Sequence, residues 1–335
     1  MSPLRRILLL ACAALCAPPL TTTVHADEFF GPSAIFNQRV DRASTTLDDR
    51  SERLVSELHQ RVRDHGTTVN MRAYTTPVYR VGPDHPTRRV TLDQDRAPAL
   101  QAVLEEVPIP AHARASAGTD GNVVVYQAST DTTWEFWRFT READGFHADW
   151  AGRVVGVSES PGWYRDIFDP ETGVAVERTH WGVTATHLVK LGGLMTLREL
   201  QRGRVDHALA IAIPEARRGV WAWPATGTDG KSDDVHAIPE GTRFRLDPEL
   251  DVDALDVPPM TRVIARAAQR YGLVVNNQGG AVSFHAEDVT RMGHDPYLPL
   301  LDGLTPAHIA HAFPWEHLQA LSSDRFGASG KRLRR

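Results

Sequence analysis

Apolar residues repeat at helical spacing over only a few stretches of this chain. The clearest lies between Asp49 and Gly66, where Leu54 and Leu58 fall on one face. Asp49 and Glu52 have the spacing of a capping box, and a glycine such as Gly66 is typical of a helix end. The pattern therefore predicts a helix here, packed against the edge of a sheet.

Short apolar runs separated by polar turns dominate the middle of the chain. The runs 123–127 and 134–139 follow turns at 120–122 and 129–132, and a further run begins at Phe146. Strands that alternate with turns at about ten-residue spacing are typical of an antiparallel sandwich. We therefore expect a mainly β fold with peripheral helices, built as an antiparallel β-sandwich.

The stretch 179–224 is rich in histidine, tryptophan and glycine, and we expect it to form the floor of a binding site. Within it, Thr196 and Glu199 have capping-box spacing and predict a short helix. The apolar run 207–213 predicts a buried strand. Further on, the Asn- and Gly-rich segment 276–280 predicts the turn of a hairpin.

The first 26 residues have the pattern of a secretion signal. Arg5 and Arg6 precede an apolar segment, and a small-residue cleavage site ends at Ala26. The apolar segment is too short and too rich in proline for an integral membrane span. A lipoprotein anchor at Cys12 is disfavoured, because it would leave an apolar segment of only about five residues. The sequence thus predicts a secreted, extracellular protein.

Charge and cysteine content narrow the class of partner. Two of the 37 basic residues lie in the signal, so 35 basic residues stand against 42 acidic ones and the net charge is −7. This balance argues against nucleic acid as a partner. No cysteine follows Cys16, so the fold is expected to need no disulfides. We expect a monomer with one domain over 27–326 and a disordered basic tail over 327–335.

The sequence contains no motif for a metal, a cofactor or a nucleophilic serine. The fifteen histidines do not show the spacing of zinc ligands, and no phosphate loop or dinucleotide fingerprint occurs. No serine sits in a nucleophile elbow. Calcium is an alternative for the loop that holds Asp229, Asp233 and Asp234, although a solvated acidic loop is the simpler interpretation. No metal and no cofactor are predicted.

Carboxylates among aromatic residues remain as candidate chemistry. On the run 134–139, Glu135 shares a face with Trp137, and Asp120 heads the preceding strand. Cleavage of a glycosidic bond needs two carboxyl groups, so this pair predicts a glycoside hydrolase, with Asp149 in reserve. His207 is a further catalytic candidate. The candidates for binding a polysaccharide or oligosaccharide are Trp134, Trp137, Trp181, Trp223, Arg243 and Arg245.

Three other interpretations stay open. In a polysaccharide lyase, His207 or Tyr126 takes a proton beside a uronate carboxylate, which Arg243 or Arg245 neutralises. A non-catalytic carbohydrate-binding or cell-wall-associated protein needs only an aromatic surface and hydroxyl partners. A structural protein would use all its tryptophans in the core.

Several short motifs are spread over most of the chain. The set comprises Asp120-Gly121-Asn122, Trp134-Glu135-Phe136, Trp181-Gly182, Gly192-Gly193-Leu194, His207-Ala208-Leu209, Trp223-Pro224-Ala225, Arg243-Phe244-Arg245-Leu246 and Tyr271-Gly272. It resembles a family of secreted, mainly actinobacterial proteins of uncharacterised function. The resemblance covers residues from about Asn37 to Leu321 and implies an extracellular, jelly-roll-like sandwich. Relatives tend to carry Asp where this chain has Asn277, so a catalytic role for that Asp would leave this member impaired.

Overall fold

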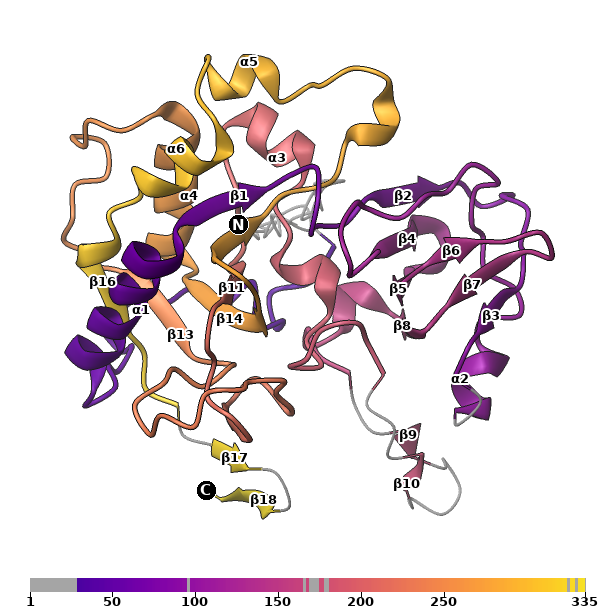
Figure 1. Ribbon diagram of the computed structural model, residues 1–335, viewed down its shortest axis with the longest axis horizontal. Helices are drawn as coiled ribbons and strands as arrows, with labels where there is room; N and C mark the ends of the chain where they lie inside the picture. The colour runs from indigo at the N-terminus through magenta and orange to yellow at the C-terminus, as the bar shows by residue number, and fades with distance from the viewer. Residues whose placement is uncertain are drawn as a thin grey trace, which may run out of the picture.

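The computed structural model describes residues 29–94, 97–164, 167–168, 175–177, 181–323, 326–328 and 331–334. The predicted secretion signal, with Cys12, lies outside the described residues. In the described part the fold is mainly β, as predicted. No helix there is long and apolar enough to cross a membrane. Figure 1 shows two β-rich halves side by side.

The first half is built on a six-stranded mixed sheet. Its strands are β1 (Thr67–Asn70), β11 (Leu209–Ile213), β13 (Arg243–Leu246), β14 (Leu273–Gln278), β15 (Val282–His285) and β16 (Leu318–Ala320). Their order is β1-β15-β11-β14-β13-β16. β11 runs parallel to β14 and antiparallel to β15. The predicted hairpin at 276–280 is therefore wrong, because β11 lies between the two strands that it would join.

Helices pack on this sheet and close the first hydrophobic core. They are α1 (Ser51–His65), α4 (Pro259–Arg270), α5 (Leu298–Leu301), α6 (Pro306–His311), and the short turns η4 (Thr290–Met292) and η5 (Trp315–His317). Leu54 and Leu58 of α1 reach the same core as Ile264 of α4. Gly66 ends α1 as predicted. The predicted capping box at Asp49 is wrong, because the helix begins two residues later and no side chain caps its first turn.

The second half holds a four-stranded sheet of order β2-β4-β5-β8 and a three-stranded sheet of order β3-β7-β6. Its elements are β2 (Val78–Val81), β3 (Val90–Leu92), α2 (Pro98–Ala102), β4 (Val123–Gln127), η1 (Ala128–Thr130), β5 (Thr132–Trp137), β6 (Thr140–Arg141), β7 (Phe146–Ala148), β8 (Trp150–Val155) and η2 (Val157–Glu159). The strands predicted at 123–127 and 134–139 correspond to β4 and β5. Trp134 and Phe136 of β5 lie in a second hydrophobic core, separate from the first.

The antiparallel arrangement predicted for the sandwich is not confirmed. Three of the sheets contain a parallel pair of strands: β11 with β14, β2 with β4, and β3 with β7. Parallel partners need long crossover connections, which spacing between neighbouring strands does not reveal. The mixed sheets therefore follow from pairings between segments far apart in the sequence.

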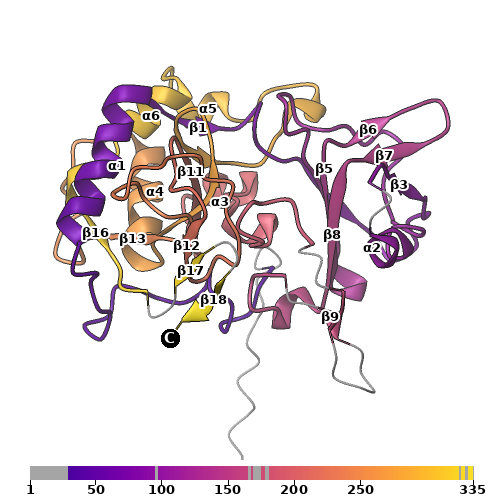
Figure 2. The same ribbon diagram turned by 60° about the horizontal axis from the view of Figure 1, so that its bottom comes forward.

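The short helix α3 (Leu197–Arg202) packs in the first hydrophobic core through Leu197 and Leu200. The predicted capping box of Thr196 and Glu199 is present, and Gly203 ends α3. Figure 2 shows α3 on the side of the first half that faces the second. The remaining elements are β9 (Ile167–Phe168), β10 (Ala175–Glu177), η3 (Lys190–Gly193), β12 (Val220–Ala222), β17 (Phe326–Ala328) and β18 (Lys331–Arg334). β17 and β18 fall partly or wholly in the tail for which disorder is predicted.

Candidate functional site

A cleft of about 760 Å³ is lined by residues from both halves. Asp120, Trp137 and Trp150 come from the second half, whereas Asn277 and Gln278 stand at the end of β14 in the first. Pockets of this size, with a few polar groups among aromatic side chains, are typical ligand sites. The cleft is therefore the candidate functional site.

Two tryptophans form an aromatic wall. Trp137 on β5 and Trp150 on β8 are directly opposite each other in the antiparallel pair, so their side chains stand on the same face of the sheet. Both are partly exposed, unlike Trp134 on the same strand. The Arg138 guanidinium lies 5.0 Å from the centre of the Trp137 ring. Side by side, the two indoles offer a flat apolar surface to a ligand.

The segment 182–187 ties the two walls together. The Gly182 N–H donates to Ala151 of β8 at 3.0 Å, and the Thr186 hydroxyl donates to the Asn276 carbonyl of β14 at 3.0 Å. Gly182 has φ +102°, and a Cβ atom there would meet the Tyr164 ring at 2.5 Å. Only glycine fits at this point. Part of the stretch expected to form a floor, from Gly182 to His187, does line the cleft.

Asn277 lies in this cleft. Its Oδ1 atom accepts a hydrogen bond from the Ala185 N–H at 3.1 Å. An Asp at this position, which the resemblance implies for the family, could accept the same bond through a carboxylate oxygen and would add a negative charge to the wall.

Asp120, which the sequence suggests as a catalytic carboxylate, lines the cleft. Its backbone carbonyl accepts a hydrogen bond from the Arg138 N–H at 2.8 Å, which fixes the turn beside Trp137. Lys190 is buried nearby. Burial lowers the pKa of Lys190, and the charges of Asp120 and Glu135 oppose that shift. Asp120 thus faces the cleft with the buried Lys190 side chain near it.

A second carboxyl group lines the cleft together with a buried partner. Asp229 is exposed to the cleft, and its backbone N–H donates to Glu240 Oε2 at 2.9 Å. Glu240 is fully buried. Burial, and next the charge of Asp229, raise the pKa of Glu240 to about 8. Glu240 therefore carries a proton at neutral pH, close to the Asp229 carboxyl group.

Glu135, the first choice from the sequence, does not line the cleft. Its side chain is fully buried and accepts three hydrogen bonds, from the backbone N–H groups of Lys190 and Leu191 and from the Tyr164 hydroxyl, at 3.0, 2.9 and 3.1 Å. Burial raises the pKa of Glu135 to about 7, against the effect of these donors. Other residues cover both faces of β5 at this point. The alternation of side chains along the strand therefore does not identify an exposed face. Glu135 holds η3 against β5.

The other polar candidates also lie away from the cleft lining. His207 Nε2 lies 3.2 Å from Glu199 Oε1, and its Nδ1 lies 2.8 Å from the Ala208 carbonyl oxygen, so both ring nitrogens are occupied. Arg243 donates to the Tyr271 carbonyl, and burial lowers its pKa to about 10. Arg245 donates to the Val40 carbonyl and to Gln319. These contacts join elements of the first half.

Of the tryptophans proposed for substrate binding, only Trp137 lines the cleft. Trp134 and Trp181 are buried in the second core. Trp223 is partly exposed and packs edge-on against Trp163, with ring centres 4.6 Å apart. The reserve acid Asp149 pairs with Arg138 at 2.9 Å.

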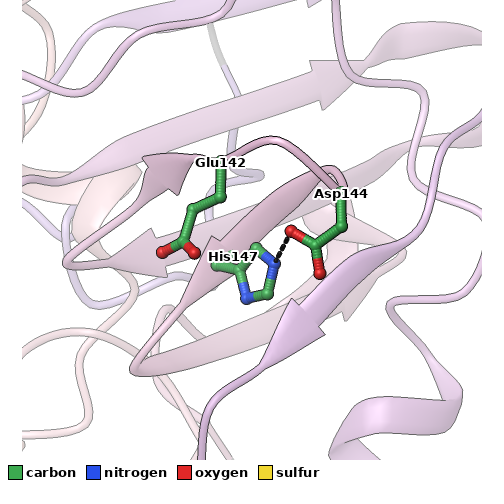
Figure 3. A group of neighbouring side chains, drawn as sticks. All are labelled: Glu142, Asp144 and His147. Carbon is green, nitrogen blue, oxygen red and sulfur yellow. Dashed lines mark hydrogen bonds and ion pairs between the residues drawn. The ribbon is translucent and has the colours of Figure 1, made fainter.

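Figure 3 shows the one group in the described part of the chain whose acidic and histidine side chains converge closely enough for a metal ion. It comprises Glu142, Asp144 and His147, at the turn between β6 and β7. His147 Nδ1 lies 2.9 Å from Asp93, and Nε2 lies 3.1 Å from Asp144. The bond with Asp93 raises the pKa of His147 despite partial burial, and Asp144 adds to the effect. A protonated imidazole that donates to two carboxylates has no lone pair for a metal, so this geometry fits an ion-pair network.

Sequence reasoning missed several residues of the cleft. The sequence suggests Asp229 only as an alternative calcium ligand. Nothing in the pattern connects it to Glu240, eleven positions later. Trp150 closes the predicted run that begins at Phe146, but the structure divides this run: β7 ends at Ala148, and Trp150 begins β8, which pairs with β5. The chain matches no protein-family model, no curated protein and no solved structure. The resemblance to the actinobacterial family stays a prediction.

Proposed function

We propose that this is a secreted protein that binds a polysaccharide in the cleft and hydrolyses its glycosidic bonds. The observation that carries the proposal is the wall of Trp137 and Trp150 beside Asp120 in a cleft that Asp229 also lines. Sugar rings present apolar C–H faces that stack on indoles, while their hydroxyls bind carboxylates and amides. Asn277 and Gln278 supply such amides.

The two kinds of carboxyl group suit the two roles in glycoside hydrolysis. One carboxyl must be protonated and give its proton to the glycosidic oxygen, and the other must be ionised. Glu240 holds a proton at neutral pH and passes it to the Asp229 carboxylate, which delivers it to the glycosidic oxygen. Asp120, with Lys190 near it, acts as the carboxylate that attacks the sugar carbon or activates a water molecule.

The residues assigned to the lyase alternative lie outside the cleft lining. This alternative assigned the base to His207 or Tyr126 and the neutralising charge to Arg243 or Arg245, and none of these four residues lines the cleft. Hydrolysis is therefore the version that the geometry favours.

The test measures release of reducing ends from a panel of neutral, uronate-containing and bacterial cell-wall polysaccharides. Wild type is compared with Asp120→Asn and Asp229→Asn. Asp233→Asn is the matched control, because Asp233 lies in the same loop as Asp229 but pairs with Arg218 at 2.8 Å. We expect both cleft variants to lose about 10²–10⁴-fold in rate and the control to keep its rate.

Other outcomes assign other functions. Binding of a polysaccharide without release of reducing ends would leave a non-catalytic carbohydrate-binding protein. Unsaturated products that absorb in the ultraviolet would indicate a lyase. A folded protein that neither binds nor cleaves any member of the panel contradicts the proposal.

A further inference from the structure

A second hollow adjoins the cleft. This side hollow, of about 400 Å³, is lined by His65, Glu215 and Gly280, among others. It shares two lining residues with the cleft, Lys231 and Gln278. The Lys231 N–H donates to Gln278 Oε1 at 3.1 Å, so the two shared residues hold each other at the boundary.

The side hollow lies where two parallel strands end. β11 ends at Ile213, just before Glu215, and β14 ends at Gln278, just before Gly279. The two strands pair in parallel through these last residues. Ligands of sheets with parallel strands gather beyond the carboxyl ends of those strands. The same edge therefore supports both hollows.

The lining of the side hollow carries charged side chains at one side and exposed glycine backbone at the other. The Glu215 carboxylate lies 3.4 Å from the Arg61 guanidinium and 3.9 Å from His65 Nε2. Gly280 is exposed and has open space where a side chain would stand. Exposed glycine backbone permits close approach of a ligand, and the charged groups offer partners for hydroxyls.

We infer that the side hollow is a further subsite and that the substrate is an extended glycan chain of several sugar units. This inference rests on the proposed function of the cleft. A pocket for one small ligand measures about 300–1,000 Å³, and the cleft with its side hollow exceeds that range. The chain would stack on Trp137 and Trp150, pass Asp120 and Asp229, and continue past Gln278 over Gly280.

A single substitution can fill the side hollow. Gly280 has no left-handed φ, and no atom lies within 4 Å of the position that a Cβ atom would take there, so Gly280→Phe adds a ring without a clash at its Cβ atom. Gly82→Phe is the matched control, because Gly82 is also exposed and equally open but lies after β2, outside both hollows. The probe is a ladder of oligosaccharides of rising length, prepared from whichever panel polysaccharide wild type binds.

For wild type and Gly82→Phe, we expect affinity to rise with chain length beyond the length that fills the cleft. For Gly280→Phe, that rise disappears, so the longest oligosaccharides bind about tenfold less tightly than to wild type, while the shortest ones bind equally. The same rise in Gly280→Phe as in wild type would overturn the subsite and leave the proposed function intact. If wild type binds no member of the panel, the proposed function fails and the subsite falls with it.

Discussion

At the residue scale, Glu135 shows how a chemically suggestive residue can have a structural role. Its two oxygens accept three hydrogen bonds, and two of these come from backbone N–H groups of η3. In Glu135→Gln one oxygen becomes an NH₂ group, which cannot accept. At least one buried donor is then left without a partner, which costs about 1–3 kcal/mol.

We therefore expect Glu135→Gln to lower the free energy of unfolding by about that amount while each folded molecule keeps its wild-type rate. Urea denaturation and reducing-end release at matched folded concentration check the two parts. Glu142→Gln, at an exposed position, is the control. Wild-type stability combined with lost activity would return Glu135 to the catalytic role that the sequence suggested.

The Asp229–Glu240 pair gives a prediction about pH. The pKa of Glu240 is raised to about 8, so the proton is present below that pH and is lost above it. We expect kcat/KM to fall above about pH 8. The Thr228 hydroxyl lowers the pKa of Glu240 by favouring its ionised form. Thr228→Ala should therefore raise the pKa further and move the alkaline limb of the profile to higher pH.

The pH dependence of kcat/KM for wild type and Thr228→Ala measures this shift. Thr140→Ala, in the other half, should leave the limb in place. A limb that stays fixed, or moves to lower pH, would show that another group supplies the proton.

At the element scale, local sequence patterns predicted those features that depend only on residues close together in the chain. The capping box at Thr196, the glycine ends of α1 and α3, and strands β4 and β5 all depend on contacts within a few residues. The insertion of β11 between β14 and β15 depends on pairing between segments far apart in sequence, which no local pattern encodes. The candidate site divides in the same way: Asp120 and Trp137 belong to two neighbouring strands and their turns, whereas the proximity of Asp229 to Glu240 depends on the fold.

The ion pair between His207, just before β11, and Glu199 of α3 gives a further prediction. Burial alone would lower the pKa of His207, but the charge of Glu199 and its bond more than offset this, and the pKa is raised. The ion pair therefore stabilises the fold fully below the ordinary histidine pKa of about 6.5, and the stabilisation is lost as pH rises through the raised value.

Replacing His207 by Gln should lower the free energy of unfolding by about 1–3 kcal/mol at pH 6 and by less at higher pH, once the wild-type imidazole is neutral. Urea denaturation over a pH series measures the difference. His311→Gln, on an exposed part of α6, should show no such trend. A difference that is independent of pH would mean that His207 acts through packing rather than charge.

At the scale of the whole molecule, the cleft is lined by residues from both halves, so we expect both halves to contribute to ligand binding. Trp137 belongs to the half built on the second core, and Asn277 belongs to the sheet of the first. The segment 182–187 binds both walls through Ala151 and Asn277. A ligand that contacts both walls should therefore stabilise the two halves together.

A ligand that binds only the folded state stabilises it by about 2.7 kcal/mol at a concentration 100 times Kd. We expect the polysaccharide to raise the Tm of wild type in one transition. Trp137→Ala and Asn277→Ala, from opposite walls, should each weaken binding by about tenfold and reduce that rise, because each removes a contact that the other wall cannot replace. Trp163→Ala is the control, since Trp163 packs on Trp223 outside the cleft lining. Loss of binding in Trp137→Ala with full binding in Asn277→Ala would show that the second half alone holds the ligand and that the cleft is not a shared site.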